Sequence, residues 1–329
     1  MAFSTKTSTD NLLSAHARYA ARAAAACGYG FRSLDGADGY LFEVSDGDRR
    51  ATFAAGAGTP YALNDARAAS IARDKAFCAE TLRQAALPVV AGRMYFVTER
   101  WREVRSPGRE IEDALVFSAA AQYPVFCKPI SASNGLYAEV IESPEAFADY
   151  AMRVGREHFA ILVQPFICAP EHRVFVLNGR ALFSYRKALP QVEGDGENPL
   201  HALVAAMGRE PGAAPLKPRG RDEHGRLLVN GDVPARGAIV TLEGPANRAA
   251  GGGARGLRDG APEDLAALAV AAARAVGLSL AAVDLFDLGE AGLAVIEVNS
   301  NPMIATLEDH DRWDLIVEIW RANLEAALK

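Results

Sequence analysis

The segment VDLFDLGEAGLAVIEVNSNP, residues 283–302, consists of two alternating apolar runs around a short polar connection. Gly289-Glu290-Ala291-Gly292 supplies turn residues, so the segment predicts an antiparallel β-hairpin with a four-residue connection. This register pairs Asp284 with Glu297, and it puts Asn299 on the same face as Glu297 because side chains alternate along a strand. Nearer the turn, the same register pairs Leu288 with Leu293 and Phe286 with Val295.

Asp284 and Glu297 are therefore two carboxylates that face each other on a hairpin whose two sides are largely apolar and expected to be buried. Like charges in this position repel, and a buried charge without a partner is costly. A divalent cation resolves the conflict, since two carboxylates and the amide oxygen of Asn299 are hard ligands of the kind that Mg²⁺ takes. Two alternatives stay open: one acid is protonated, or one of them pairs with an arginine.

The composition limits the class of protein. The chain has 329 residues, half of them apolar, with 35 basic against 41 acidic side chains and a net charge of −6. These values exclude a disordered chain, a fibre and a disulfide mini-protein, and they indicate a soluble globular protein of two or three domains. Because no basic excess is present, we expect neither nucleic acid nor a membrane as partner.

The four cysteines and the hydropathy of the chain indicate its compartment. Cys27, Cys78, Cys127 and Cys168 lie far apart and form no C-x-x-C pair, so they suggest neither a zinc site nor a disulfide framework. The start of the chain does not resemble a signal peptide, and its longest apolar stretch is too short to span a bilayer. We expect a cytoplasmic protein.

Turn signals and helical periodicity divide the chain into three α/β units, residues 1–88, 89–168 and 169–329. In the first unit, one long helix is expected from Asn64 to Ala86. In the third, Asn178-Gly179 predicts a second hairpin. Residues 209–237, rich in Gly, Pro and charge, predict a mobile loop.

Lysine is rare in this chain. Only six of the 35 basic residues are lysines, at positions 6, 75, 128, 187, 217 and 329. Where arginine has replaced lysine at most positions, a lysine kept inside an ordered element is a candidate for a compact point charge.

Together these segments resemble the ATP-grasp carboxylate–amine ligases, most of all the ATP-grasp part of cyanophycin synthetase and of bifunctional glutathione synthetase. The resemblance covers nearly the whole chain and implies an N-terminal α/β domain, a lid and a C-terminal grasp domain for the three units. The motifs that carry it are DKAFCAETLRQAALPV (74–89), PVFCKPISASNG (124–135), ILVQPFICAPEHRVFVLNG (161–179), HRVFVLNGRALFSYRKALPQVEGDG (172–196), PANRAAGGGAR (245–255) and the hairpin quoted above.

The resemblance implies roles for individual residues of the nucleotide and metal sites. Lys75 and Lys128 would contact the nucleotide phosphates, with Ser131 and Gly135 in the phosphate loop. The adenine would lie against the segment from Gln164 through Pro165 to Ile167, and Glu171 would accept the ribose hydroxyls. Asp284, Glu297 and Asn299 match the magnesium ligands of the family.

The resemblance also implies catalytic and acceptor residues. Arg173 and Arg186 would stabilise the transferred phosphoryl group and the acyl intermediate, because phosphoryl transfer depends mainly on positioned charge. A structural salt bridge is the alternative for each arginine. Asn247 and Gly252 resemble a segment that lines the acceptor side.

Some positions depart from the family pattern. Gln164 stands where an acid is usual, and Lys187 with Ala188 alters an R-x-P pattern. Ala282 occupies the place where D-alanine–D-alanine ligases carry a carboxylate-binding arginine, which counts against that activity.

The activity implied is ATP-dependent formation of an amide or peptide bond through an acyl phosphate, with release of ADP and phosphate. Its cofactors would be ATP and two Mg²⁺ ions, or Mn²⁺ in their place, and its partners a small carboxylate and an amine. Dimerisation is frequent among similar proteins, so a homodimer is one expectation. The alternatives are a ligase that modifies a peptide or protein tail, and a catalytically silent nucleotide-binding regulatory subunit.

Overall fold

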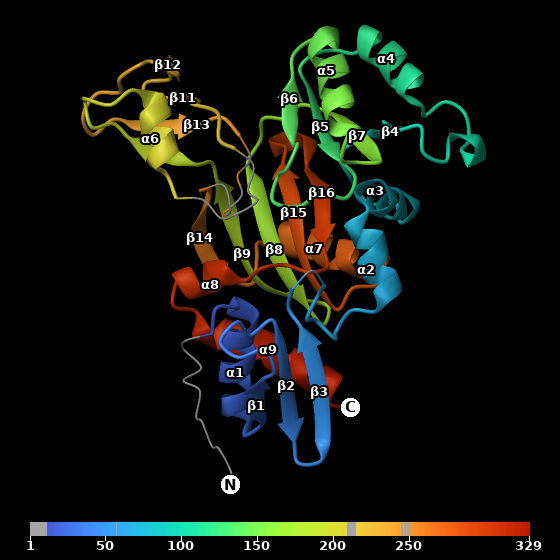
Figure 1. Cartoon of the computed structure of the whole chain (residues 1–329), viewed down its shortest axis with the longest axis vertical. Coiled ribbons are helices and arrows are strands. Elements are labelled where there is room, and N and C mark those ends of the chain that lie inside the picture. Colours follow the sequence, from blue (N-terminus) through green and yellow to red (C-terminus); the bar gives the residue numbers. More distant parts are fainter. Residues whose placement is uncertain (1–11, 57, 209–214, 245, 247, 249–250) are drawn as a thin grey trace.

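The structure is a computed structural model that describes residues 12–329 except 57, 209–214, 245, 247 and 249–250. Figure 1 shows a sheet at the centre of the molecule, two smaller units above it and the blue N-terminal unit below. In the described ranges no helix is both long and apolar enough to cross a bilayer.

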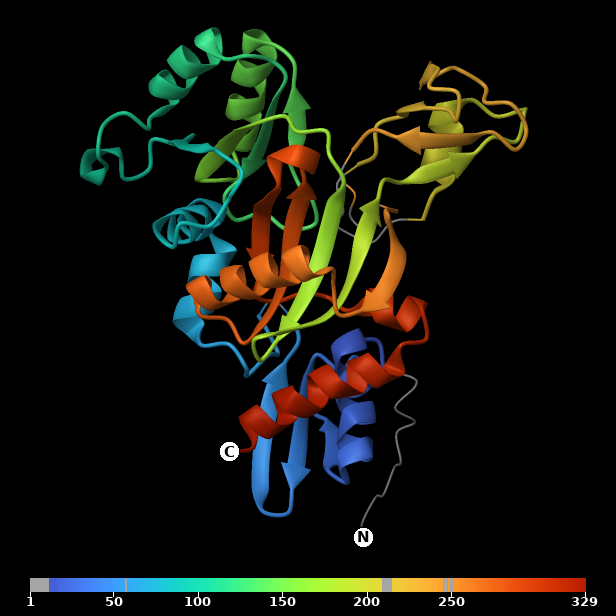
Figure 2. The same ribbon diagram turned by 180° about the vertical axis from the view of Figure 1, so that it is seen from behind.

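The central sheet is antiparallel, with the strand order β14-β9-β8-β15-β16. Helix α7 packs on one face against alternate residues such as Val174, Val176 and Val283, and Figure 2 shows it in front of the sheet. We call this the α7 face and the opposite one the site face. The elements are β8 (Glu171–Leu177), β9 (Arg180–Ala188), β14 (Gly253–Asp259), β15 (Leu280–Asp287), β16 (Leu293–Asn299) and α7 (Glu263–Val276).

The C-terminal hairpin pairs Asp284 with Glu297, as the sequence predicts, but its register changes beyond that pair. A bulge between Asp284 and Leu285 shifts the register, so that Phe286 lies opposite Ala294 and Asp287 opposite Leu293. The predicted pairings of Phe286 with Val295 and of Leu288 with Leu293 are therefore wrong. The connection runs from residue 288 to 292 and contains a short 3₁₀ helix, η4 (Gly289–Ala291). A bulge adds one residue to one strand, which simple counting from a turn does not reveal.

The hairpin predicted at Asn178-Gly179 is present and joins β8 to β9. Both residues have positive φ, 50° and 77°, which a two-residue turn of the favoured kind requires. The resulting register puts Arg173 opposite Tyr185 and His172 opposite Arg186, so the two pairs lie on opposite faces of the sheet.

The second unit is an antiparallel sheet with the order β4-β7-β5-β6, covered by two helices. Its core contains Phe147, Tyr150 and Ile161. The elements are β4 (Arg93–Phe96), β5 (Val125–Pro129), β6 (Glu139–Ile141), β7 (Ala160–Pro165), α4 (Ile111–Ala120), α5 (Pro144–Val154) and the 3₁₀ helix η2 (Arg102–Val104).

A third sheet stands where the sequence predicted a mobile loop over residues 209–237. Its order is β10-β13-β11-β12, and it has a small core of its own that includes Leu200, Leu228 and Val240. Residues 209–214 lie outside the described part of the chain, but the prediction is wrong for β11 and β12. The elements are β10 (Gln191–Glu193), β11 (Arg219–Arg221), β12 (Leu227–Val229), β13 (Ile239–Leu242) and α6 (Leu200–Ala206).

The N-terminal unit is completed by the end of the chain. Its sheet, β1-β2-β3, packs with α1 and α9 around Tyr19, Phe42 and Trp320, and Figure 2 shows α9 lying across the strands. The elements are α1 (Ala15–Cys27), β1 (Gly30–Ser33), β2 (Leu41–Asp46), β3 (Arg49–Ala54), α8 (Ala305–Asp309) and α9 (Trp313–Ala327). The division at residues 88 and 168 stays a prediction.

The single helix expected from Asn64 to Ala86 is two helices, α2 (Ala66–Arg73) and α3 (Lys75–Gln84). Asp74 lies between them with extended backbone, and its carboxylate accepts hydrogen bonds from the N–H groups of Ala76 and Phe77. Because aspartate is a strong N-cap, it starts a new helix here. Lys75 is consequently the first residue of α3 instead of lying in the middle of a longer helix.

Candidate active site

Asp284, Glu297 and Asn299 lie together on the site face of the central sheet. Asp284 on β15 is directly opposite Glu297 on β16, and its side chain is 1% exposed. The Nδ2 atom of Asn299 donates to Oε1 of Glu297 at 3.1 Å. The bulge begins just past Asp284, so it leaves this pairing intact.

Arg173 neutralises Asp284 in a two-pronged ion pair. Its Nε and Nη2 atoms donate to the two carboxylate oxygens at 2.6 and 2.7 Å. This pair follows from the register, since Asp284 is also the direct partner of Arg173 across β15 and β8. Burial alone would lower the pKa of Arg173, but Asp284 raises it well above the ordinary value.

Lys187 is a second cation in this cluster. Its Nζ atom lies 3.3 Å from Oδ2 of Asp284 and also donates to Oε1 of Glu171. The Lys187 side chain is only 7% exposed. Burial would lower the pKa of Lys187, but the two carboxylates outweigh this effect and raise it, so the ammonium form is favoured.

The carboxylates of Glu171 and Glu297 have opposite electrostatic surroundings. Burial raises the pKa of Glu171, and the nearby Asp284 adds to this effect, although Lys187 opposes it. Burial would also raise the pKa of Glu297, but Lys75, Lys128 and Lys187 hold it well below its usual range. Glu297 is therefore ionised, as a metal ligand must be.

Lys75 and Lys128 reach the same cluster from α3 and β5. The Nζ atom of Lys75 donates to the carbonyl of Ala132 at 2.7 Å and lies 3.9 Å from Oε2 of Glu297. Lys128 is 6% exposed, and burial together with Lys75 lowers its pKa. Four cations, Lys75, Lys128, Arg173 and Lys187, thus converge from four separate elements.

Arg186 does not join this cluster. It is opposite His172 on the α7 face, and it is exposed to solvent. Residues next to each other in a strand point to opposite faces, so Arg186 and Lys187 cannot both face Asp284. The structure brings Lys187 to the place that we expected for Arg186, and the rarity of lysine in the chain was the signal that could have identified it.

The residues expected around the phosphates and the adenine lie in and beside the second unit. Ser131 is exposed, and Gly135, with φ of 72°, is half-buried in the turn that follows β5. Gln164 in β7 is 4% exposed and donates to the carbonyl of Val90 at 3.4 Å. Pro165 ends β7 and is exposed, and Ile167 is half-buried on the way to β8.

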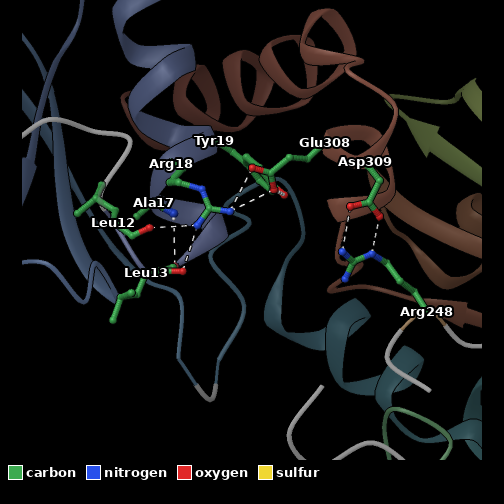
Figure 3. Close-up of polar contacts among 9 residues, drawn as sticks. Leu12, Leu13, Ala17, Arg18, Tyr19, Arg248, Glu308 and Asp309 are labelled. Atoms are coloured by element: carbon green, nitrogen blue, oxygen red, sulfur yellow. Dashed lines mark hydrogen bonds and ion pairs between the residues drawn. The ribbon is translucent and has the colours of Figure 1, made fainter. Parts of the chain in front are cut away.

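Of the two residues that we expected on the acceptor side, Asn247 lies outside the described residues, whereas Gly252 is half-buried just before β14. Figure 3 shows that Arg248 in the same segment is bound to Asp309 on α8, with Nε–Oδ2 and Nη2–Oδ1 distances of 2.7 and 3.0 Å. The preceding residue of α8, Glu308, accepts hydrogen bonds from Arg18 and Tyr19 of α1. Arg248 therefore connects this segment to α8, which is itself bound to α1.

The donor set at Asp284, Glu297 and Asn299 fits a divalent cation, because it offers two carboxylates and an amide. Within the described residues, no group of three or more His, Cys, Asp or Glu side chains is arranged to hold a metal. Asp284 forms an ion pair with Arg173, and the sequence left such a pairing open as an alternative to metal binding. The role of Asp284 as a metal ligand stays a prediction.

Comparisons with known proteins show what this chain is similar to. Residues 227–322 match the family model of the RimK-like ATP-grasp domain. The bifunctional protein GshAB of Mannheimia succiniciproducens is 30% identical over 225 residues, which are 60% of this chain and 30% of that protein. Cyanophycin synthetase of Trichormus variabilis is 24% identical over 221 residues, 59% of this chain and 23% of the relative.

The fold has a counterpart among solved structures. The bifunctional glutathione synthetase from Pasteurella multocida matches with a TM-score of 0.50 and 22% identity, covering 92% of this chain and 44% of that one. The chain spans less than a third of the length of the curated relatives it matches.

The protein has the ATP-grasp fold, as the sequence predicted. Residues 227–322 match the RimK-like ATP-grasp domain, and the chain is distantly homologous to the ATP-grasp parts of GshAB and cyanophycin synthetase.

Proposed function

We propose that this protein is an ATP-dependent carboxylate–amine ligase that joins small amino-acid-type substrates through an acyl phosphate and releases ADP and phosphate. The observation that carries the proposal is the convergence of four cations with Asp284, Glu171 and Glu297 at one end of the site face. A cluster of this kind suits a polyphosphate ligand that carries several negative charges.

In this proposal, Lys75 and Lys128 bind the nucleotide phosphates. Lys128 is buried, so its charge is screened little by water and acts strongly on a nearby anion. Lys75 is held by the carbonyl of Ala132, and this contact positions its ammonium group between α3 and the turn after β5. Both lysines would favour the phosphate-bound state by charge.

Arg173 and Lys187 act on the transferred phosphoryl group and the acyl phosphate. Their contacts with Asp284 fix them before substrate binds, and preorganised charge requires little rearrangement during the reaction. Lys187 contacts Oε1 of Glu171, so we assign the ribose hydroxyls to Oε2 of the same carboxylate.

Asp284, Glu297 and Asn299 would hold Mg²⁺, which neutralises phosphate charge and orients the phosphates when bound. The low pKa of Glu297 supports this role, because a deprotonated carboxylate is present over the whole physiological range.

The proposal is tested by measuring phosphate release from Mg·ATP against a matrix of amino acids and small peptides, with mass spectrometry of any new amide. We expect ADP and an amide with at least one substrate pair, and loss of both in Glu297→Gln. Glu290→Gln is the matched control, because Glu290 is exposed in the connection of the same hairpin.

Other outcomes would select another function. Nucleotide binding without turnover across the whole matrix would exclude the small-molecule ligase. Turnover restored by an added peptide would then identify a ligase for peptide tails. Binding of ATP with no turnover on any substrate would indicate a regulatory subunit.

A further inference from the structure

Arg186, which lies away from the cluster, sits in an unusual electrostatic position. On the α7 face it is directly opposite Arg255 of β14, and both side chains are exposed. Neither guanidinium has a carboxylate within 4.0 Å among the residues that the structure describes. Like charges directly opposite one another on a sheet destabilise it, so this pair weakens the fold unless an anion lies between them.

Protection of a sheet edge does not explain the pair. Charged residues are common on edge strands because they discourage pairing with other chains, and this accounts for Arg255 and Arg258 of β14. Arg186, however, is on β9, which lies between β14 and β8. Because β9 is an inner strand, the charge of Arg186 cannot protect a sheet edge.

The cationic surface continues from this pair onto the small sheet. Arg255 donates to Oε1 of Gln191 at 3.0 Å, and Nε2 of Gln191 donates to Oγ1 of Thr241 at 2.9 Å. Thr241 is opposite Arg221, whose Nη1 atom donates to the carbonyl of Gly225. Among the described residues, no carboxylate lies within 4.0 Å of the Arg221 guanidinium. We call these five residues the arginine strip: Arg186, Arg255, Gln191, Thr241 and Arg221.

Few acids lie beside the arginine strip. Glu193 is exposed two residues from Gln191, and Glu243 is used by Arg219. Asp264 and Asp287 act on the half-buried His172 but form no ion pair with Arg186. The strip as a whole is therefore positively charged.

We propose that the arginine strip binds the carboxylates of an extended acidic peptide. Arginine binds carboxylates through two parallel hydrogen bonds, and clusters of arginine are a recurring device for recognising acidic segments. One carboxylate can lie between Arg186 and Arg255, but contact with Arg221 on another sheet requires a ligand with several anionic groups. The strip is also connected to the acceptor side, since Gly252 directly precedes β14.

This inference extends the proposed function by naming a peptide partner, and it is tested without ATP turnover. A fluorescein-labelled peptide of six glutamates is titrated with the full chain in the absence of nucleotide, and fluorescence anisotropy gives Kd. We expect the double variant Arg186→Gln/Arg255→Gln to bind at least ten-fold more weakly. Arg321→Gln, on the exposed side of α9, is the matched control and should bind like the wild type.

The peptide of six glutamines is the second control and should bind weakly to every variant. Equal affinity of the double variant and the wild type would overturn the proposal. Displacement of the acidic peptide by Mg·ATP would place it in the nucleotide site instead, and displacement by millimolar inorganic phosphate would indicate a small-anion site. A melting temperature of the double variant equal to or above that of the wild type excludes loss of fold as the cause.

The two proposals can fail separately. Phosphate release with small substrates but no peptide binding would support the ligase and overturn the peptide-binding role of the arginine strip. Peptide binding that depends on both arginines, with no turnover on any substrate, would support that role and overturn the ligase.

Discussion

The two faces of β8 and β9 differ in how their charged side chains are surrounded: those on the site face are largely buried and paired, whereas Arg186 on the α7 face is exposed. On the site face, Arg173 and Lys187 are largely buried and are matched by Asp284 and Glu171. Arg186 is the neighbour of Lys187 on β9 and lies on the α7 face, where it is exposed and opposite Arg255. In the described part of the chain, no carboxylate lies within ion-pair distance of Arg186. Buried charges must be compensated within the protein, whereas an exposed pair is hydrated and remains available to a ligand.

The largest effect is expected from removing the anion at the centre of the site face. Asp284→Asn leaves the guanidinium of Arg173 and the ammonium of Lys187 buried without their shared partner. Loss of one partner of a buried pair costs about 3–5 kcal/mol in the free energy of unfolding. Urea unfolding measures this loss of stability, with Glu290→Gln as the exposed control. Equal midpoints for the wild type, Asp284→Asn and Glu290→Gln would show that the cluster adds nothing to stability.

The second test compares the neighbours Lys187 and Arg186 directly. Lys187→Gln should lower kcat/KM for phosphate release by roughly 100-fold, as removal of a preorganised charge does in other enzymes. Arg186→Gln should keep kcat/KM within about two-fold of the wild type, since the Arg186 side chain lies on the opposite face. Lys187→Arg keeps the charge and should recover part of the loss. The reverse ranking of Lys187 and Arg186 would contradict the site as described.

A third prediction concerns a buried titratable group without a charged partner. His16 packs among Tyr61, Tyr19 and Trp320, and burial lowers its pKa to about 4. Between pH 6.5 and 4 the unfolded chain binds a proton at His16 that the folded chain does not. Lowering the pH through this range should therefore reduce the free energy of unfolding by up to about 3 kcal/mol. Unfolding of His16→Leu should lack this component when compared with the wild type across the same pH range.

The outcome for His16 distinguishes two kinds of buried group. Arg173, Lys187 and Glu297 are stabilised as ions by their neighbours, whereas burial keeps His16 neutral. Parallel curves of the wild type and His16→Leu from pH 7 to pH 4 would mean that His16 becomes protonated without cost, which would contradict its apolar surroundings.

The smallest effect is expected on the α7 face. Arg186→Glu replaces a repulsive pair by an ion pair with Arg255, and cross-strand pairs of this kind contribute about 0.2–1 kcal/mol. Thermal unfolding at low salt should show a higher melting temperature, and 0.5 M NaCl should remove most of the gain by screening. Arg321→Glu is the control, and a lower melting temperature in Arg186→Glu would show that no repulsion exists.

Local sequence predicted the hairpins and the elements of the site well. Asn178-Gly179 has the residues that a tight turn needs, and the alternation around residues 289–292 identified the pair Asp284 and Glu297. Such signals are available from sequence because turn geometry and the period of a strand depend on residues only a few positions apart.

Two errors arose where a local signal was present but was weighed wrongly. Asp74 is a good N-cap, and its presence was sufficient to divide one long helix into α2 and α3. Glycine, proline and charge between residues 209 and 237 suggested a loop, but Leu228 packs with Val192 and Val240 from distant parts of the chain. That core forms only when the strands are assembled.

By itself, the sequence determined which residue types were available: paired carboxylates, rare lysines and arginines at the ends of strands. Tertiary structure decided which of them meet, because the pairing of β8 with β15 and with β9 brings Arg173 and Lys187 to Asp284. A shift of one residue moves a side chain to the other side of a sheet. For this reason Lys187 lies in the charged cluster, while Arg186, its neighbour in the sequence, lies on the opposite surface.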